Sequence, residues 1–298
     1  MNTAVERALS GPLVVGVDGS APSLRAVDWA ADEAVLRGVP LRLVYACLWE
    51  RYEGAALARD IGRPTALPLA QDVAGAAAER ARVRHPDLKV TADVVFEEPE
   101  YALVREGRHA SALVVGTRGR SGIAEMLLGS VSLAVAARAD CPVIVLRGSH
   151  DNRATPPVRR RVVVGVGEDV KESAAVGFAV AEARRRGVTL EAVRAWRCPA
   201  HESTDHPLMS GEPASLHEER AAEELEAALR DVPADIDVRR RTVEGHAGRV
   251  LLAASHEADL LVVGARRREG HFGLQLGRVA HAALHHSACP VAVVPQQA

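Results

Sequence analysis

A glycine-rich loop that follows an apolar run carries the residues whose types and spacing could do chemistry. The apolar run at 113–115 is typical of a buried parallel strand, and Gly116, Gly119 and Gly122 follow it. Glycine lets the backbone turn tightly and approach a ligand closely. Two arginines within the loop match the charge of a phosphate group. We therefore interpret the loop as a phosphate-binding segment.

A helix is predicted to begin directly after this loop, with Ser130 as its N-cap. The unpaired N–H groups and the positive dipole end of such a helix attract an anion. An ordinary turn with a capping serine is the structural alternative, but strand, loop, arginines and helix start all favour a ligand. The candidate binding residues of this segment are Gly116, Arg118, Gly119, Arg120, Ser121, Gly122, Gly129, Ser130, Val131 and Ser132.

The spacing of these residues resembles a signature of the universal stress protein family. Gly116, two residues, Gly119, nine residues and Gly129-Ser130 match the pattern G-x2-G-x9-G-[S/T]. The resemblance implies that ATP, with or without Mg²⁺, lies with its ribose and phosphates along the loop. It also implies an α/β fold: Rossmann-like domains of the adenine nucleotide alpha hydrolase type, each a five-stranded parallel sheet in the order 3-2-1-4-5 with helices on both faces.

The chain repeats itself, so the resemblance covers nearly its whole length. The apolar segments at 13–17 and 113–116 recur at 162–166 and 261–264, and Cys141-Pro142-Val143 recurs as Cys289-Pro290-Val291. We therefore expect two tandem copies of one domain, at 1–147 and 161–298. The stretch 148–160 lacks apolar periodicity and contains Pro156-Pro157, which is typical of a linker.

Within each copy the hydrophobic pattern predicts five strands that alternate with helices, as in a parallel α/β sheet. In the first copy strands are predicted at 13–17, 41–47, 90–96, 113–116 and 143–146, with helices at 23–36, 69–84, 100–109 and 131–137. In the second copy strands are predicted at 162–166, 188–195, 236–242, 260–263 and 291–294, with helices at 172–186, 214–230, 247–257 and 278–286.

Asp18 is expected to face the glycine-rich loop. Ligands of doubly wound sheets bind outside the carboxyl ends of the strands, where the strand order reverses. In the order that the resemblance implies, the first and fourth strands meet there, and Asp18 follows the first strand while Gly116 ends the fourth. The resemblance places Asp18 near adenine, and Gly16 joins the candidate binding residues. The alternative role for Asp18 is turn chemistry, because Asp-Gly-Ser is also a favourable turn sequence.

The second copy is expected to be a degenerate site, so that the chain binds about one nucleotide. Gly264 and Gly277 match Gly116 and Gly129 and form a weaker second set of candidate residues. However, Arg267 stands for Gly119, Arg278 for Ser130, and Gly167 for Asp18. The opposing consideration is electrostatic, because the added arginines could hold a phosphate in another geometry.

No sequence pattern indicates a catalytic centre. There is no G-x4-G-K-[S/T] lysine, and the only lysines are Lys89 and Lys171. We expect a nucleotide-dependent regulator of a stress response with slow hydrolysis at most. An adenylyl transferase or slow ATPase of a related α/β class, and a ligand-free dimerisation module, are the alternatives. His281 and His285 have helical spacing that could hold zinc, but a solvated helix face is favoured and no metal site is assigned.

Composition restricts the partners. The formal net charge of −2 and the 3% aromatic content argue against nucleic acid and membrane surfaces as partners. The four cysteines form no CxxC pair and the first residues lack the apolar core of a signal peptide, so a cytoplasmic location is expected. The last strand of each copy is short, apolar and at a sheet edge. We expect these strands to pair within the chain, and we expect homodimers as well.

Overall fold

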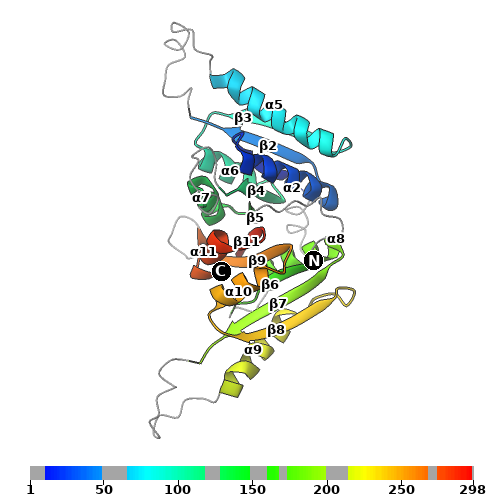
Figure 1. Ribbon diagram of the computed structural model, residues 1–298, viewed down its shortest axis with the longest axis vertical. Coiled ribbons are helices and arrows are strands. Elements are labelled where there is room, and N and C mark those ends of the chain that lie inside the picture. Colours follow the sequence, from blue (N-terminus) through cyan, green and yellow to red (C-terminus); the bar gives the residue numbers. More distant parts are fainter. Residues whose placement is uncertain are drawn as a thin grey trace.

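The computed structural model describes residues 11–48, 66–117, 128–147, 160–167, 173–198, 214–267 and 274–296, and in it the two copies fold alike (Figure 1). The first copy consists of β1 (Leu13–Val17), α2 (Ala21–Arg37), β2 (Leu41–Ala46), α5 (Ala66–Arg84), β3 (Val90–Val95), α6 (Pro99–Gly107), β4 (Ala112–Gly116), α7 (Ser130–Arg138) and β5 (Val143–Leu146). The second consists of β6 (Arg161–Gly165), α8 (Ala174–Arg186), β7 (Thr189–Trp196), α9 (Ala214–Ala228), β8 (Val238–Glu244), α10 (Ala247–Ser255), β9 (Leu260–Arg267), β10 (Leu274–Gln275), α11 (Arg278–His286) and β11 (Val291–Gln296).

The strands form one sheet that runs through both copies in the order β3-β2-β1-β4-β5-β11-β9-β6-β7-β8. Pairs inside each copy are parallel, apart from the short β10, and both copies have the predicted order 3-2-1-4-5. The copies meet where β5 and β11 pair antiparallel, with Val143 opposite Val293 and Val145 opposite Val291. The predicted α/β class with tandem Rossmann-like domains is therefore confirmed.

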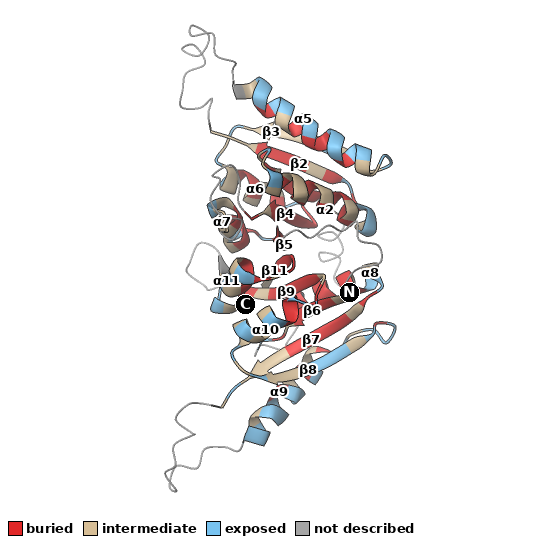
Figure 2. Cartoon of the chain, viewed as in Figure 1, coloured by how far each residue is buried: buried red, intermediate tan, exposed pale blue. Residues whose placement is uncertain are grey.

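Helices cover both faces of the sheet, and the core is aliphatic. Figure 2 shows the buried residues concentrated on the central strands. One hydrophobic cluster lies between the sheet and the helices α2, α5, α8 and α9, and the other lies under α6, α7, α10 and α11. No helix in the described part of the chain is both long and apolar enough to cross a membrane.

Helices α2 and α8 begin and end with the same chemistry. The hydroxyls of Ser20 and Ser173 accept hydrogen bonds from the N–H groups of Ser23 and Val176, as N-cap side chains do. The left-handed Gly38, with φ of 66°, ends α2 as predicted, and Gly187 ends α8 with φ of 61°. These caps determine the residues at which each helix begins and ends.

The strand β9 is longer than predicted and is followed by a strand that the periodicity missed. It continues to Arg267, where β10 pairs antiparallel to it with Leu274 opposite Arg267. In the first copy β4 ends at Gly116, whose counterpart Gly264 lies inside β9. The second copy therefore extends a strand where the first copy leaves the sheet.

Four charged side chains lie buried between α2 and α8, one helix from each copy. Arg37 Nε lies 2.6 Å from Glu33 Oε1, and Arg37 Nη2 lies 3.0 Å from Glu182 Oε1. Arg186 forms ion pairs with both Glu33 and Glu182. The side chains of Glu33, Arg37 and Glu182 are at most 1% exposed. We call this set the interdomain charge cluster.

Aromatic rings cover the two arginines of the interdomain charge cluster. The guanidinium carbon of Arg37 lies 5.3 Å from the ring centroid of Phe178, and that of Arg186 lies 5.5 Å from the ring centroid of Trp29. A cation over an aromatic face is attracted to it, more strongly where water is excluded. Each arginine is thus held by a carboxylate and a ring of the other copy, which ties the two copies together.

The two carboxyl groups of the interdomain charge cluster have very different pKa values. Burial and the neighbouring Glu33 carboxylate raise the pKa of Glu182 to about 7. Burial also opposes ionisation of Glu33, but Arg186 and Arg37 outweigh it and lower the pKa of Glu33 to about 2. Near neutral pH the cluster therefore gains or loses one proton at Glu182, while Glu33 stays ionised.

We expect the free energy of unfolding to fall as pH rises from about 4.5 to 7. Folded Glu182 keeps a proton in this window that the unfolded chain releases, so the folded state is favoured at the lower pH, by up to about 3 kcal/mol. Urea unfolding at a series of pH values measures this slope. Glu182→Gln should abolish the slope, while the exposed control Glu79→Gln should keep it. Equal slopes in the two variants would contradict the assignment to Glu182.

Candidate functional site

A cavity of about 520 Å³ opens at the carboxyl ends of β1 and β4 in the first copy. These are the neighbouring strands at which the order of the sheet reverses. Its described lining residues come from the ends of β1, β2 and β4 and from the starts of α2, α6 and α7. They are Gly16, Val17, Asp18, Ser20, Ser23, Val44, Ala46, Pro99, Leu103, Val115, Gly116, Leu128, Gly129, Ser130, Val131 and Ser132.

The cavity brings together the candidate residues that lie on either side of the loop. Gly16 and Asp18 from the end of β1 lie opposite Gly116 at the end of β4 and the segment 129–132 at the start of α7. The remaining candidates lie outside the described residues. These are Arg118, Gly119, Arg120, Ser121 and Gly122.

Asp18 lines the cavity and also organises the turn before α2. Its Oδ1 accepts hydrogen bonds from the Ser20 N–H, at 2.9 Å, and from the Ser20 hydroxyl, at 2.6 Å. Ser20 is the N-cap of α2, so Asp18 holds the residue that caps this helix. Asp18 therefore stabilises the turn before α2 and also forms part of the cavity wall.

Gly116 has a packing reason to be glycine in addition to any ligand. A Cβ on Gly116 would lie 2.9 Å from both the carbonyl carbon and the oxygen of Pro22, at the start of α2. These are backbone atoms, so a side chain here would displace α2 from the sheet. The glycine allows α2 and the end of β4 to approach closely, and this approach shapes the cavity floor.

The start of α7 corrects the predicted role of Ser130. Gly129 is the N-cap, and Ser130 is the first helical residue with its side chain exposed, so Ser130 does not cap the helix. Gly129 has no side chain to cap the first turn, so among the described residues no N-cap side chain accepts a hydrogen bond from the N–H groups there. Ser132 instead turns inward, and its hydroxyl donates to the Gly116 carbonyl at 2.6 Å. This bond joins the helix to the end of β4.

Sequence reasoning missed the apolar wall of the cavity. Val44 and Ala46 at the end of β2 and Leu103 on α6 contribute to it. Because β2 pairs with β1, the carboxyl end of β2 could have been added from the expected strand order alone. The contribution of Leu103 depends on how α6 packs over the sheet, and no local pattern shows that. The cavity thus has an apolar side and a side formed by an uncapped helix start.

The matching place in the second copy has a different structure. A Cβ on Gly264 would lie 2.6 Å from Nε2 of Gln296, whose amide donates to Ser173 at 3.1 Å. A side chain of the second copy therefore occupies the space next to Gly264. Gly277 is the N-cap of α11, and Arg278 follows it as an exposed residue.

The histidines of α11 stack on each other. The ring centroids of His281 and His285 lie 4.3 Å apart. Burial, then the charges of His281, His286 and Arg147, lowers the pKa of His285. Among the described residues no group of three or more His, Cys, Asp or Glu side chains gathers that could hold a metal ion. The repeated Cys141 and Cys289 are buried free thiols, and burial raises the pKa of Cys141 to about 12.

Comparison with known proteins gives consistent matches over the whole chain. The model of the universal stress protein family matches residues 11–147 and 159–295. Universal stress protein Rv2005c of Mycobacterium tuberculosis is 32% identical over 301 residues, which cover 95% of this chain and 97% of the relative. Universal stress protein Rv2623 of the same species is 31% identical and covers 94% and 95%.

A solved structure shares the fold. The universal stress protein from Archaeoglobus fulgidus DSM 4304 superimposes with a TM-score of 0.67 at 18% identity, and the match covers 96% of this chain and 98% of that one. Two family matches in tandem agree with the repeated strand order of the sheet. The chain belongs to the universal stress protein family.

Proposed function

We propose that the chain binds ATP in the first-copy cavity and acts as a nucleotide-dependent regulator in a stress response. The observation that carries the proposal is the cavity at the β1–β4 switch point, where an uncapped helix start faces an apolar wall. This combination suits a ligand with an anionic end and a flat apolar end. The glycine signature of the loop supports the same ligand, because ATP-binding members of the family carry it.

The proposed pose follows from the two sides of the cavity. The phosphates lie toward the first turn of α7, where helix N–H groups are available, and toward the loop that bears Arg118 and Arg120. The base lies toward Val44, Ala46 and Leu103. Asp18 at the end of β1 is then within the part of the cavity that holds the nucleoside.

The lining residues support slow hydrolysis at most. Asp18 is the single carboxylate among the described lining residues, which include no lysine and no histidine. Its Oδ1 is already engaged by two donors from Ser20. Activation of a water for attack on a phosphate needs a positioned base, and Asp18 is committed to the turn. Bound ATP would then remain intact, and the fraction of chains that carry it would follow the concentration of free ATP.

We expect titration calorimetry of the nucleotide-free protein to give about one tightly bound ATP per chain, in the first-copy cavity, and Ser130→Glu to abolish this tight binding. A carboxylate in the first turn of α7 opposes the phosphates but interacts favourably with the helix dipole, by about 0.3–1 kcal/mol. The variant should therefore remain folded. Gly119→Glu should also abolish binding, because a side chain and a negative charge enter the loop.

Ser130→Gln is the matched control for this prediction, since it adds similar bulk without charge and should keep most of the affinity. Unchanged ATP affinity in both Ser130→Glu and Gly119→Glu would refute the first-copy site. Two equivalent tight sites per chain would show that the second copy is not degenerate.

One further measurement distinguishes an ATP-binding protein from the two alternatives, a related enzyme and a ligand-free module. The purified protein is denatured, and released nucleotide is identified by mass spectrometry. Recovered ATP supports a binding protein. Recovered ADP together with sustained phosphate release in solution supports a slow ATPase, and the absence of any nucleotide supports a ligand-free module.

Assembly beyond a single chain is also a proposal. Because β5 and β11 pair with each other, a homodimer of whole chains has to use a different surface. A fragment of residues 1–147, in contrast, leaves the apolar β5 unpaired at the edge of its sheet. We expect this fragment to form homodimers in sedimentation velocity experiments. A fragment that stays monomeric at micromolar concentration would contradict this expectation.

A further inference from the structure

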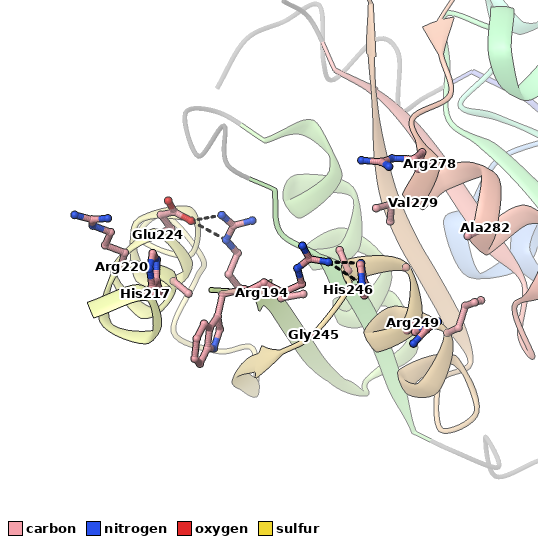
Figure 3. Close-up of a pocket in the computed structure, with 17 residues that line it drawn as sticks. Arg194, His217, Arg220, Glu224, Gly245, His246, Arg249, Arg278, Val279 and Ala282 are labelled. Atoms are coloured by element: carbon pink, nitrogen blue, oxygen red, sulfur yellow. Dashed lines mark hydrogen bonds and ion pairs between the residues drawn. The ribbon is translucent and has the colours of Figure 1, made fainter. Parts of the chain in front are cut away.

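The second copy contains a larger cavity, of about 1000 Å³, at the carboxyl ends of β7 and β8 (Figure 3). It is bounded by α9 and by the starts of α10 and α11. Gly264 and Gly277 do not line it, but part of its wall corresponds to the wall of the first-copy cavity: Ala247, Arg278 and Val279 match Pro99, Ser130 and Val131. The cavity thus overlaps the matching place in the second copy and extends from it toward β8 and α9. The cationic residues that line it are Arg194, Arg197, Arg220, Arg249 and Arg278, accompanied by His217 and His246. We call it the arginine cavity.

The described residues that line the arginine cavity carry more positive than negative charge. Glu224 is the single carboxylate among its described lining residues, and it lies 2.7 Å from Nε of Arg194. Arg197 contacts the ring of His246 at 2.7 Å. Within the described part of the chain the structure records no ion pair for Arg249 or Arg278, and both are exposed. Figure 3 shows them on the α10 and α11 side, across from Glu224.

Two helices begin at this cavity without a side-chain cap. The N-caps of α10 and α11 are His246 and Gly277, and neither makes a side-chain hydrogen bond to its first turn. Gly248 and Val279 from these first turns line the cavity. The N–H groups of two helix starts and the guanidinium groups thus face one space, an arrangement suited to an anion with several charges.

The first copy lacks this charge at the matching positions, so the fold does not require it. Glu97, Glu98 and Glu100 of the first copy correspond to Gly245, His246 and Gly248, which line the arginine cavity. Tyr101 corresponds to Arg249, and Ser130 to Arg278. Each of these differences removes a negative charge or adds a positive one. Together they change the net charge at these positions from negative to positive.

We propose that the arginine cavity binds a small polyphosphate anion, either an inorganic polyphosphate or the phosphate chain of a nucleotide, independently of the first-copy site. Several phosphates in a row match several guanidinium groups, because each guanidinium can donate two parallel hydrogen bonds. Trp196 also lines the cavity, and a base is the part of a nucleotide that suits an aromatic neighbour. A nucleoside triphosphate is therefore expected to bind here more tightly than inorganic triphosphate, but more weakly than ATP binds in the first-copy cavity.

The test is titration calorimetry of the full chain with inorganic triphosphate. Ser130→Glu provides the background, so that binding in the first copy does not contribute. In this background the chain should bind triphosphate, and the added pair Arg249→Gln and Arg278→Gln should weaken binding roughly tenfold or more. The control pair, Arg108→Gln and Arg230→Gln, removes the same charge from exposed positions outside the cavity and should leave the affinity unchanged.

Three outcomes would overturn the proposal: no triphosphate binding in the Ser130→Glu background, no loss in the cavity pair, or an equal loss in the two pairs. A second titration with ATP and GTP in the same background separates the sources of the anion. Tighter nucleotide binding identifies a nucleotide ligand, and equal affinity identifies recognition of the phosphate chain alone. These results do not depend on ATP binding in the first copy, so the two proposals fail separately.

Discussion

The antiparallel pairing of β5 with β11 is the constraint on which the rest of the structure depends. It joins the strands of both copies into one continuous sheet and brings α2 beside α8, where the interdomain charge cluster is buried. Buried charges are costly unless each one is paired, and here each arginine contacts carboxylates from both copies. The ion pairs between Arg37 and Glu182 and between Arg186 and Glu33 form only when the two copies are joined, so strand pairing and charge pairing support each other.

The two copies share a fold but differ at the carboxyl ends of their strands. The first copy leaves the sheet at Gly116 and returns at an uncapped helix start, next to an apolar wall. The second copy prolongs β9 and pairs it with β10, while Gln296 occupies the space beside Gly264. Its open space lies farther along the edge and is lined by arginines. A duplicated fold can keep its core and still present two chemically distinct cavities, because the core residues are on the strands and the cavity residues follow them.

Much of the fold follows from the sequence, because strands that are buried on both faces read as apolar runs. The bounds of β1 and the end of α2 at Gly38 are examples. The strand order came from the family resemblance, and with it the meeting of Asp18 and Gly116 at one cavity. Features that depend on contacts between distant segments were not predictable in this way. Glu33 and Glu182 are 149 positions apart, and nothing near either residue shows that they share a buried site. The arginine cavity likewise needs α9 and α10 to face each other, and the start of α7 was misjudged because a serine beside a glycine left two candidate caps.

The antiparallel junction also determines how far apart bound ligands would be. The parallel strands of the first copy run in the opposite direction to those of the second. Their carboxyl ends therefore lie at opposite ends of the strands of the shared sheet. Even the shortest junction strand, β5, has four residues and spans about 13 Å. That separation exceeds the Debye length of about 8 Å at physiological ionic strength. Two anions bound at these edges would hardly repel each other, so the molecule can carry both at once without an electrostatic penalty between them.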